Sequence, residues 1–227
     1  MEHISEIEFF KYILQSDLFS KSILLLLTIS SIVSWSIIIG KWFSLSFEKR
    51  RSKKFMGDFE RFSQNGDDGG ILEKYEGSSL YKIYDRGELE FSLLKEKFGD
   101  RVSSYIDKRG LEPIERSLIS EYEKMNSKLK WGMNILAILS SISVFIGLLG
   151  TVWGILRSFE KMSAGGGIET IGPSIAEALI ATAVGLIVAI PASFFYNRYL
   201  KKIEEVMLTS KGFIRSYLNY VDRNSFQ

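Results

Sequence analysis

Three long stretches of the chain carry no charged residue, and this limits the possible folds more than any other feature. They run from Ser22 to Gly40, from Trp131 to Leu156 and from Ala178 to Asn197, and the sequence around them is rich in charge. A helix needs about 20 mainly apolar residues to cross the roughly 30 Å of bilayer hydrocarbon. We therefore predict an all-α integral membrane protein with three transmembrane helices.

The remaining composition argues against several kinds of chemistry. A net charge of +2 gives no case for nucleic-acid binding, and the lack of cysteine rules out disulfides and thiolates. The only histidine, His3, lies near the first residue and is expected to be solvated. The three stretches offer no Ser–His pair, no paired aspartates and no metal-ligand cluster. We expect no enzyme activity, no cofactor and no metal.

Basic residues predict the orientation of the spans, because they collect on the cytoplasmic side of a membrane. They follow the first stretch, precede the second and follow the third: Lys41, Lys49, Arg50, Arg51, Lys53, Lys54, Lys124, Lys128, Lys130, Arg198, Lys201 and Lys202. The segment between the second and third stretches has only Arg157 and Lys161, against Glu160 and Glu169. We expect an external N-terminus and a cytoplasmic C-terminus.

These signals predict seven segments along the chain. They are an external amphipathic segment (1–20), transmembrane helix 1 (21–41), a cytoplasmic helical region (42–130), transmembrane helix 2 (131–157), an external loop (158–172), transmembrane helix 3 (173–197) and a cytoplasmic C-terminal helix (198–227). The first segment has apolar residues at helical spacing between acids, so it either lies on the outer surface or leads helically into the span. These apolar residues are Ile4, Ile7, Phe10, Leu14 and Leu18.

Two of the spans are expected to continue as helices beyond the membrane. An apolar stripe follows Pro113, and we predict one helix from about Pro113 to about Ser158. The stripe consists of Ile114, Leu118, Tyr122, Met125 and Leu129. The third span has no Gly or Pro between Ala192 and Lys211, although Pro191 inside it removes one backbone hydrogen bond and can kink the helix. A loop is expected at residues 64–70.

Small side chains form a stripe along one face of the second span and another along the third. The first stripe is Ser140, Ser143, Gly147, Thr151, Gly154 and Ser158, and the second is Ala178, Thr182, Gly185, Ala189 and Ala192. One interpretation is close helix packing, for which we select Gly147, Gly150, Gly154, Ala178, Gly185, Ala189 and Pro191. The other is a polar path whose hydroxyls, on Thr151 and Thr182, both donate and accept hydrogen bonds. The two interpretations are compatible.

Glu177 is the one acid close to the apolar part of the third span. It lies roughly 12 Å from the predicted midplane, toward the outside, and about 140° around the helix from Thr182. Its carboxylate either reaches the outer boundary or has a function, and intramembrane acids are functional candidates by default. Because the spans offer no second titratable partner, we expect another protein to supply the main proton carrier.

Two motifs carry a resemblance to a known family. FIGLLGTVWGILRSF (Phe145–Phe159) and SIAEALIATAVGLIVAIPASFFYNR (Ser174–Arg198) closely resemble the motif regions of the TolQ–ExbB family, whose wider relatives include flagellar stator subunits of MotA type. VSWSIIIGKW (Val33–Trp42) and YNR (Tyr196–Arg198) look more like TolQ than ExbB. One departure is Ser143-Val144, where relatives often have a proline.

The resemblance implies a bacterial inner-membrane proton channel that works as a motor. Family members form a ring, here expected to be a pentamer, around a TolR-like single-span partner dimer whose aspartate carries protons. Thr151 and Thr182 match the family's channel threonines, and Glu177 matches its acid at the start of the third span. A Tol-Pal role in outer-membrane integrity and division, with a TolA-like periplasm-spanning protein as a further partner, is the implied function. The alternatives are an ExbB-like role in outer-membrane uptake and a passive membrane scaffold.

Overall fold

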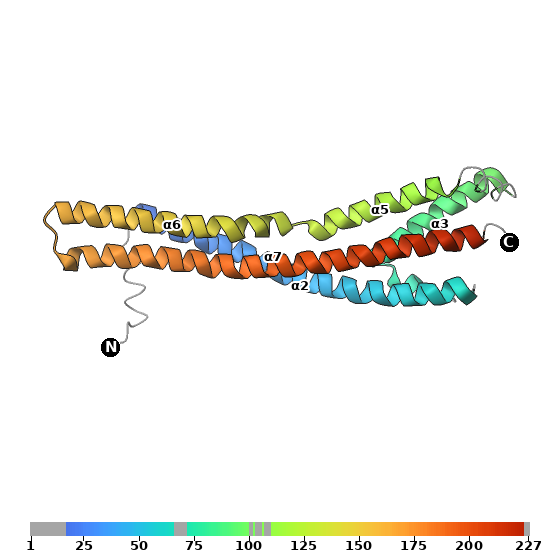
Figure 1. Ribbon diagram of the computed structural model, residues 1–227, viewed down its shortest axis with the longest axis horizontal. Coiled ribbons are helices and arrows are strands. Elements are labelled where there is room, and N and C mark those ends of the chain that lie inside the picture. The colour runs from blue at the N-terminus through green and yellow to red at the C-terminus, as the bar shows by residue number, and fades with distance from the viewer. Residues whose placement is uncertain (1–16, 66–71, 100–101, 103–105, 107–109, 225–227) are drawn as a thin grey trace. The chain divides into compact units, whose positions relative to one another are not determined.

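The structure of the protein is a computed structural model that describes residues 17–65, 72–99, 102, 106 and 110–224. Every regular element in these ranges is helical (Figure 1). The elements are α2 (Leu18–Asn65), the 3-10 helix η1 (Leu72–Tyr75), α3 (Ser79–Phe98), α5 (Glu112–Lys130), α6 (Met133–Ser163) and α7 (Ile168–Asn224). Three helical stretches are long and apolar enough to span a membrane, which confirms the predicted all-α fold with three candidate spans.

Two parts of the sequence predictions lie mainly outside the described residues. They are the amphipathic segment, of which the structure describes only residues 17–20, and the loop at 64–70, of which it describes only the start, at the end of α2. In α2, the first span continues as one helix as far as Asn65. A helical region from residue 42 was predicted, but not that it would continue the first span without a break.

The chain divides into two compact units. One, called the apolar unit here, comprises Met1–Gly40 and Gly132–Arg198; the other, the charged unit, comprises Lys41–Trp131 and Tyr199–Gln227. The divisions fall at or next to the ends of the charge-free stretches. Each unit is described by itself below.

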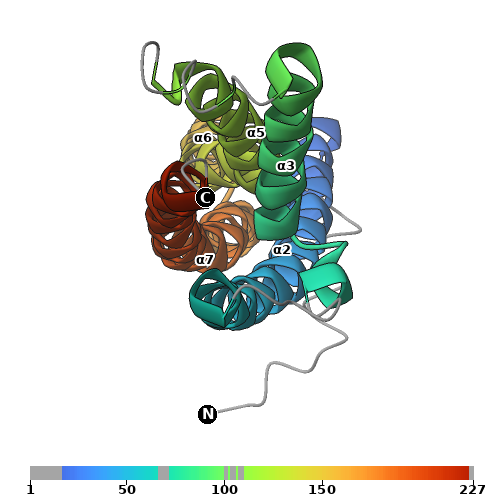
Figure 2. The same ribbon diagram turned by 90° about the vertical axis from the view of Figure 1, so that its right-hand side faces the viewer.

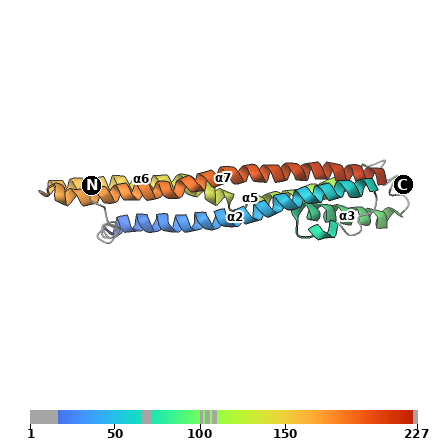
Figure 3. The ribbon, with the colours of Figure 1, turned by 90° about the horizontal axis from the view of Figure 1, so that it is seen from below.

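In the apolar unit, α6 and the first part of α7 form an antiparallel pair joined by a tight turn (Figures 1 and 3). The turn uses Gly165, which has a positive φ of 85°, and the backbone N–H of Gly166 donates to the carbonyl of Lys161. The first part of α2 packs against this pair through a small core of Ile23, Leu27 and Ala181. The turn therefore places the two helices that carry the small-residue stripes side by side.

Most of the apolar surface of these spans faces outward. Only 28%, 22% and 33% of the residues in the most apolar window of each span are buried inside the structure. Large apolar side chains such as Ile32, Phe145 and Ile187 are more than half exposed. A surface of this kind needs lipid or another protein to cover it.

The prediction of one helix from about Pro113 to about Ser158 was wrong. The helix α5 ends at Lys130, and α6 begins at Met133 after a break at Trp131 and Gly132. Gly132 has a φ of 77°, in the left-handed region that glycine adopts without steric cost. A single glycine costs a continuous helix only about 1 kcal/mol, so the sequence did not mark this one as a break. By contrast, α7 runs on through Pro173 and Pro191 without ending.

The charged unit is held together by aromatic side chains. Phe55 and Phe59 of α2, both fully buried, contact Phe213 of α7 at ring-centroid distances of 5.3 and 4.9 Å. Helix α5 buries Ile114, Leu118, Met125 and Leu129 from its predicted apolar stripe, while Tyr122 is partly exposed. Figure 2 shows the ribbons of α3, α5 and the later parts of α2 and α7.

Close approach of α3 and α7 depends on Gly87. A Cβ atom on Gly87 would lie 2.5 Å from the Tyr217 ring and 2.9 Å from Leu118. The Tyr217 hydroxyl donates to a carboxylate oxygen of Glu88 at 3.0 Å. Glu88, which follows Gly87, thus provides a hydrogen-bond acceptor for the one polar group of the buried Tyr217 side chain.

Candidate functional site

The two small-residue stripes bring the backbones of α6 and α7 into direct contact. A Cβ atom on Gly185 would lie 2.6 Å from the carbonyl oxygen of Ser143, and one on Gly147 would lie 3.1 Å from the Cα atom of Thr182. Real Cβ atoms do not come within 3.0 Å of backbone atoms. Any larger residue at Gly185 would therefore push the helices apart.

The same close contact extends along α6 toward its C-terminal end. A Cβ atom on Gly150 would lie 2.6 Å from that of Ala181, and one on Gly154 would lie 2.4 Å from that of Ala178. Ala189, also selected from the sequence, is buried, whereas Pro191 is partly exposed. Small residues at membrane helix interfaces permit this kind of close packing.

The two candidate channel threonines make different hydrogen bonds. The Thr182 hydroxyl donates across the interface to the carbonyl oxygen of Gly147 at 2.8 Å. The Thr151 hydroxyl donates within its own helix to the carbonyl oxygen of Leu148 at 2.7 Å. Gly147 is one helical turn, or about 6 Å, from Thr151 along α6. Thr182 is thus held at nearly the same position along α6 as Thr151. The oxygen of each hydroxyl still has lone pairs that can accept a hydrogen bond.

Glu177 directly precedes Ala178, the residue that makes the close contact with Gly154, and its side chain is partly buried. Its Oε1 atom is buried and has no hydrogen-bond partner among the described residues. The structure shows no hydrogen bond between Glu177 and Thr182 in this part of the chain. An unpartnered carboxylate oxygen is costly, so such groups in a native protein often have a functional role.

Sequence reasoning missed a polar cluster at the start of α2. The Asp17 carboxylate accepts from the indole Nε1–H of Trp153 at 3.1 Å and pairs with Arg157 at 2.9 Å. Phe19 packs on the Trp153 ring with centroids 4.4 Å apart. Asp17 and Arg157 carry opposite charges and lie at the predicted outer ends of two spans. That pairing of charges was the only feature of the sequence from which the cluster could have been predicted.

This cluster changes the acidity of Asp17. Burial acts to raise the pKa of the carboxyl, but hydrogen bonds from Ser20 and Trp153 and the charge of Arg157 act in the opposite direction. The latter effects prevail, and the pKa lies below the ordinary value of 3.8. The cluster is therefore ionised at neutral pH and ties the start of α2 to α6.

A second cation in the apolar unit bridges α6 and α7, where Lys161 donates to the hydroxyl of Ser174 at 2.6 Å. In the charged unit, the buried Lys41 donates to the carbonyl oxygen of Leu129 at 2.6 Å. Leu129 belongs to the last turn of α5, whose carbonyls lack partners because the helix breaks at Gly132. Lys41 therefore caps the end that the break creates.

The fold and the site together define a multi-pass helical membrane protein with a close-packed, hydroxyl-bearing helix pair. Residues 88–211 match the family described as MotA/TolQ/ExbB proton channel family. The chain is 30% identical to the Tol-Pal system protein TolQ of Haemophilus influenzae, over 98% of this chain and 97% of that protein. It is 33% identical to TolQ of Pseudomonas aeruginosa, covering 80% of this chain and 78% of the relative.

Proteins named ExbB are similar to a comparable degree. The biopolymer transport protein ExbB of Pseudomonas putida is 32% identical over 83% of this chain and 55% of its own length. The chain belongs to the MotA/TolQ/ExbB proton channel family, and the resemblance inferred from its two motifs is confirmed. Members of this family are proton channels and not enzymes. Identities this close to one another do not separate a TolQ role from an ExbB role.

Proposed function

We propose that this chain is the channel subunit of a TolQ-type motor in the bacterial inner membrane. With a TolR-like partner, it would convert proton-motive force into mechanical work across the periplasm, for outer-membrane integrity and envelope constriction during division. The observation that carries the proposal is the hydrogen bond from Thr182 to Gly147, which holds a hydroxyl at the interface of the two motif-bearing helices. The near full-length similarity to a TolQ protein supports the Tol-Pal type.

The proposed topology has the N-terminus in the periplasm and the C-terminus in the cytoplasm. The spans are 21–41, 131–157 and 173–197, with 158–172 as a periplasmic loop and 42–130 and 198–227 in the cytoplasm. Two observations support this arrangement: the division of the chain close to the ends of these spans, and the basic residues clustered beside them.

The proton path is proposed to run past Thr151 and Thr182, with Glu177 at its outer end or at a subunit interface. Each hydroxyl can pass a proton by donating and accepting in turn. The largely exposed apolar faces support assembly into a ring, proposed to be a pentamer, around a TolR-like dimer. The partner's carboxylate would supply a second titrating carboxyl, since Glu177 is the one acid in the described part of the proposed spans, and a TolA-like protein would transmit the motion.

Reconstitution tests the channel role. The purified chain is placed in liposomes with and without a TolR-like partner, and proton uptake is followed with a pH-sensitive dye under an imposed potential. We expect flux only with both proteins, and loss of flux in Thr182→Val. Thr28→Val is a matched control, because Thr28 is exposed on α2 and bonds only its own helix. Equal flux in wild type and Thr182→Val would contradict the channel role, and no flux from the wild-type pair would favour a passive scaffold.

The ExbB-like alternative has its own support in the similarity to the Pseudomonas putida protein. Complementation separates the two roles. We expect the gene to restore detergent resistance to a strain lacking TolQ, and not growth on chelated iron to a strain lacking ExbB. The reverse result would assign the chain to outer-membrane uptake.

A further inference from the structure

An aromatic surface lies on the charged unit, on α2, immediately after the first charge-free stretch. Trp42, Phe43 and Phe47 are 46%, 70% and 59% exposed. With Ser44, Ser46 and Arg50 they line a shallow groove of about 460 Å³. We call Trp42, Phe43, Ser46, Phe47 and Arg50 the α2 groove. Exposure of three large aromatic side chains on one surface to water is unfavourable, and such patches usually mark a binding site.

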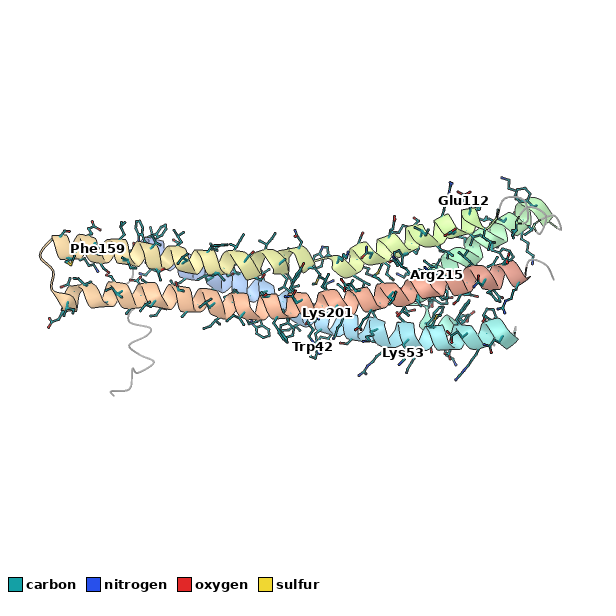
Figure 4. The ribbon with its side chains drawn as sticks, in the orientation of Figure 1. Trp42, Lys53, Glu112, Phe159, Lys201 and Arg215 are labelled. Atoms are coloured by element: carbon teal, nitrogen blue, oxygen red, sulfur yellow. The ribbon has the colours of Figure 1, made fainter. Side chains whose placement is uncertain are left out.

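The residues of the groove share one face of the helix. Their spacing of one, three, one and three positions keeps them within about 140° of one another at 100° per residue. Arg50 lies near the centre of this face and about 10 Å along the axis from Phe43. Lys53 and Lys54 continue the face by one more turn, and Figure 4 shows Trp42 and Lys53 along the same edge of α2. The face thus changes from aromatic to cationic along the helix.

No acid balances this charge on the same face. Glu48 is the only acid between Leu18 and Gly57, and its carboxylate accepts the backbone N–H of Ser79 at 2.9 Å, toward α3. Within the part of the chain that the structure describes, Arg50, Lys53 and Lys54 form no ion pair or hydrogen bond. The adjacent basic residues differ: Lys49 pairs with Glu205, and Arg51 lies over the Phe47 ring. The cations of this face are therefore available to an outside anion.

We propose that the α2 groove binds the headgroup of one anionic phospholipid. The guanidinium of Arg50 and the hydroxyl of Ser46, one turn apart, take the phosphate diester, since guanidinium groups bind phosphate oxygens in pairs. Trp42, Phe43 and Phe47 take the glycerol backbone and the first carbons of the acyl chains, where aromatic residues normally sit in a membrane. Lys53 and Lys54 select a net negative headgroup by charge.

The proposal commits to a lipid because the groove joins an apolar wall to a phosphate-binding centre. Free phosphate would leave the three aromatic rings in contact with water, so it matches only half of the surface. The inference rests on α2 crossing a membrane, which is part of the proposed topology, and not on proton transport. Its failure would leave the channel assay unaffected.

Native mass spectrometry of the delipidated full chain in detergent tests the binding. Dioleoylphosphatidylglycerol is titrated against dioleoylphosphatidylcholine and against inorganic phosphate. We expect retention of one phosphatidylglycerol per chain, with weaker retention of phosphatidylcholine and none of phosphate. Arg50→Gln should weaken phosphatidylglycerol binding about tenfold, as expected for the loss of a charge-assisted hydrogen bond.

Arg61→Gln is the matched control, since Arg61 lies on the same helix beyond the groove with its side chain 83% exposed. It should bind the lipid like wild type. Arg50→Lys keeps the charge and guards against a folding defect, and it should bind more tightly than Arg50→Gln. Equal binding of the two lipids, or equal binding by Arg50→Gln and wild type, would overturn the proposal. Efficient crosslinking of Phe43→Cys to a second copy in membranes would also overturn it, by showing that protein covers the face.

Discussion

The hydroxyl of Thr182 donates to the carbonyl oxygen of Gly147 across the α6–α7 interface, at 2.8 Å. This contact exists because Gly147 and Gly185 let the two backbones approach within van der Waals distance. The two candidate channel threonines are therefore held differently: the Thr182 hydroxyl bonds to the neighbouring helix, and the Thr151 hydroxyl bonds only within its own helix.

Thr182→Ser should therefore retain proton flux, and Thr182→Val should lose most of it. Serine keeps the hydroxyl that can bond Gly147, whereas valine has a similar volume without any donor. Removing this one interhelical bond should cost only about 1 kcal/mol, so both variants should still assemble. Dye-monitored flux in liposomes measures the first effect, and thermal unfolding in detergent measures the second. If the serine variant were as inactive as the valine variant, the hydroxyl would not be the active group.

Gly154→Ala should destabilise the helix pair. The new methyl group would lie 2.4 Å from the Cβ atom of Ala178 and 3.0 Å from the carbonyl oxygen of Ser174, so the helices must move apart. Overpacking of this kind costs about 1–3 kcal/mol. Gly212→Ala is the matched control, because nothing lies within 4 Å of its Cβ position in α7. The control variant should be as stable as wild type or more stable by up to about 1 kcal/mol. If Gly154→Ala and the control had the same melting temperature, the close contact of Gly154 with Ala178 would be refuted.

Glu177→Gln should raise the melting temperature slightly while lowering proton flux. The carboxylate has a buried oxygen without a hydrogen-bond partner among the described residues, and a neutral amide at this position should cost about 1 kcal/mol less to bury. Residues that destabilise a fold in this way often serve function. Thermal unfolding and liposome flux are measured on the same preparation. A variant less stable than wild type but fully active would assign Glu177 a purely structural role.

Asp17→Asn should loosen the attachment of α2 to α6 by roughly 1 kcal/mol or less, since the pair with Arg157 is partly exposed. The folded-state pKa of Asp17 is lowered, so its contribution to stability is complete above the ordinary value of 3.8 and is lost as the pH falls below it. The melting temperatures of wild type and variant should differ at pH 7 and converge as the pH falls through the lowered folded-state pKa of Asp17. Asp222→Asn, at an exposed position near the end of α7, should show no such difference. A gap that persists at low pH would point to another cause.

Tyr217→Phe should destabilise the charged unit by about 1 kcal/mol through loss of the hydrogen bond to Glu88. Burial and the nearby charge of Glu88 raise the pKa of Tyr217 above its ordinary value of 10.0. Its contribution is therefore complete below pH 10 and is lost as the pH rises further, because the unfolded chain releases the phenolic proton first. Ultraviolet titration near pH 11 should show fewer phenolates in folded wild type than in the unfolded chain, and the deficit should be smaller in Tyr217→Phe. Normal titration of all tyrosines would contradict the buried hydroxyl.

Much of the membrane architecture could be predicted from residue order alone. The three charge-free stretches, the small-residue faces and the apolar stripe of α5 are local patterns whose meaning does not depend on distant residues. The break at Gly132 could not be predicted, because a glycine within a helix and a glycine that ends one differ by only about 1 kcal/mol of local preference. Here the left-handed conformation of Gly132 and the capping of α5 by Lys41 go together.

The sequence by itself determined the three candidate spans, because any helix that crosses a bilayer must be long and largely uncharged. It also determined the family, because the two motifs are long and specific. Only the tertiary structure decided which groups meet. It set Thr182 on Gly147, left a Glu177 oxygen without a partner, joined Asp17 to Trp153 and Arg157, and buried Phe55 and Phe59 against Phe213. These pairings join segments far apart in the chain, and their energies depend on packing distances that no local pattern encodes.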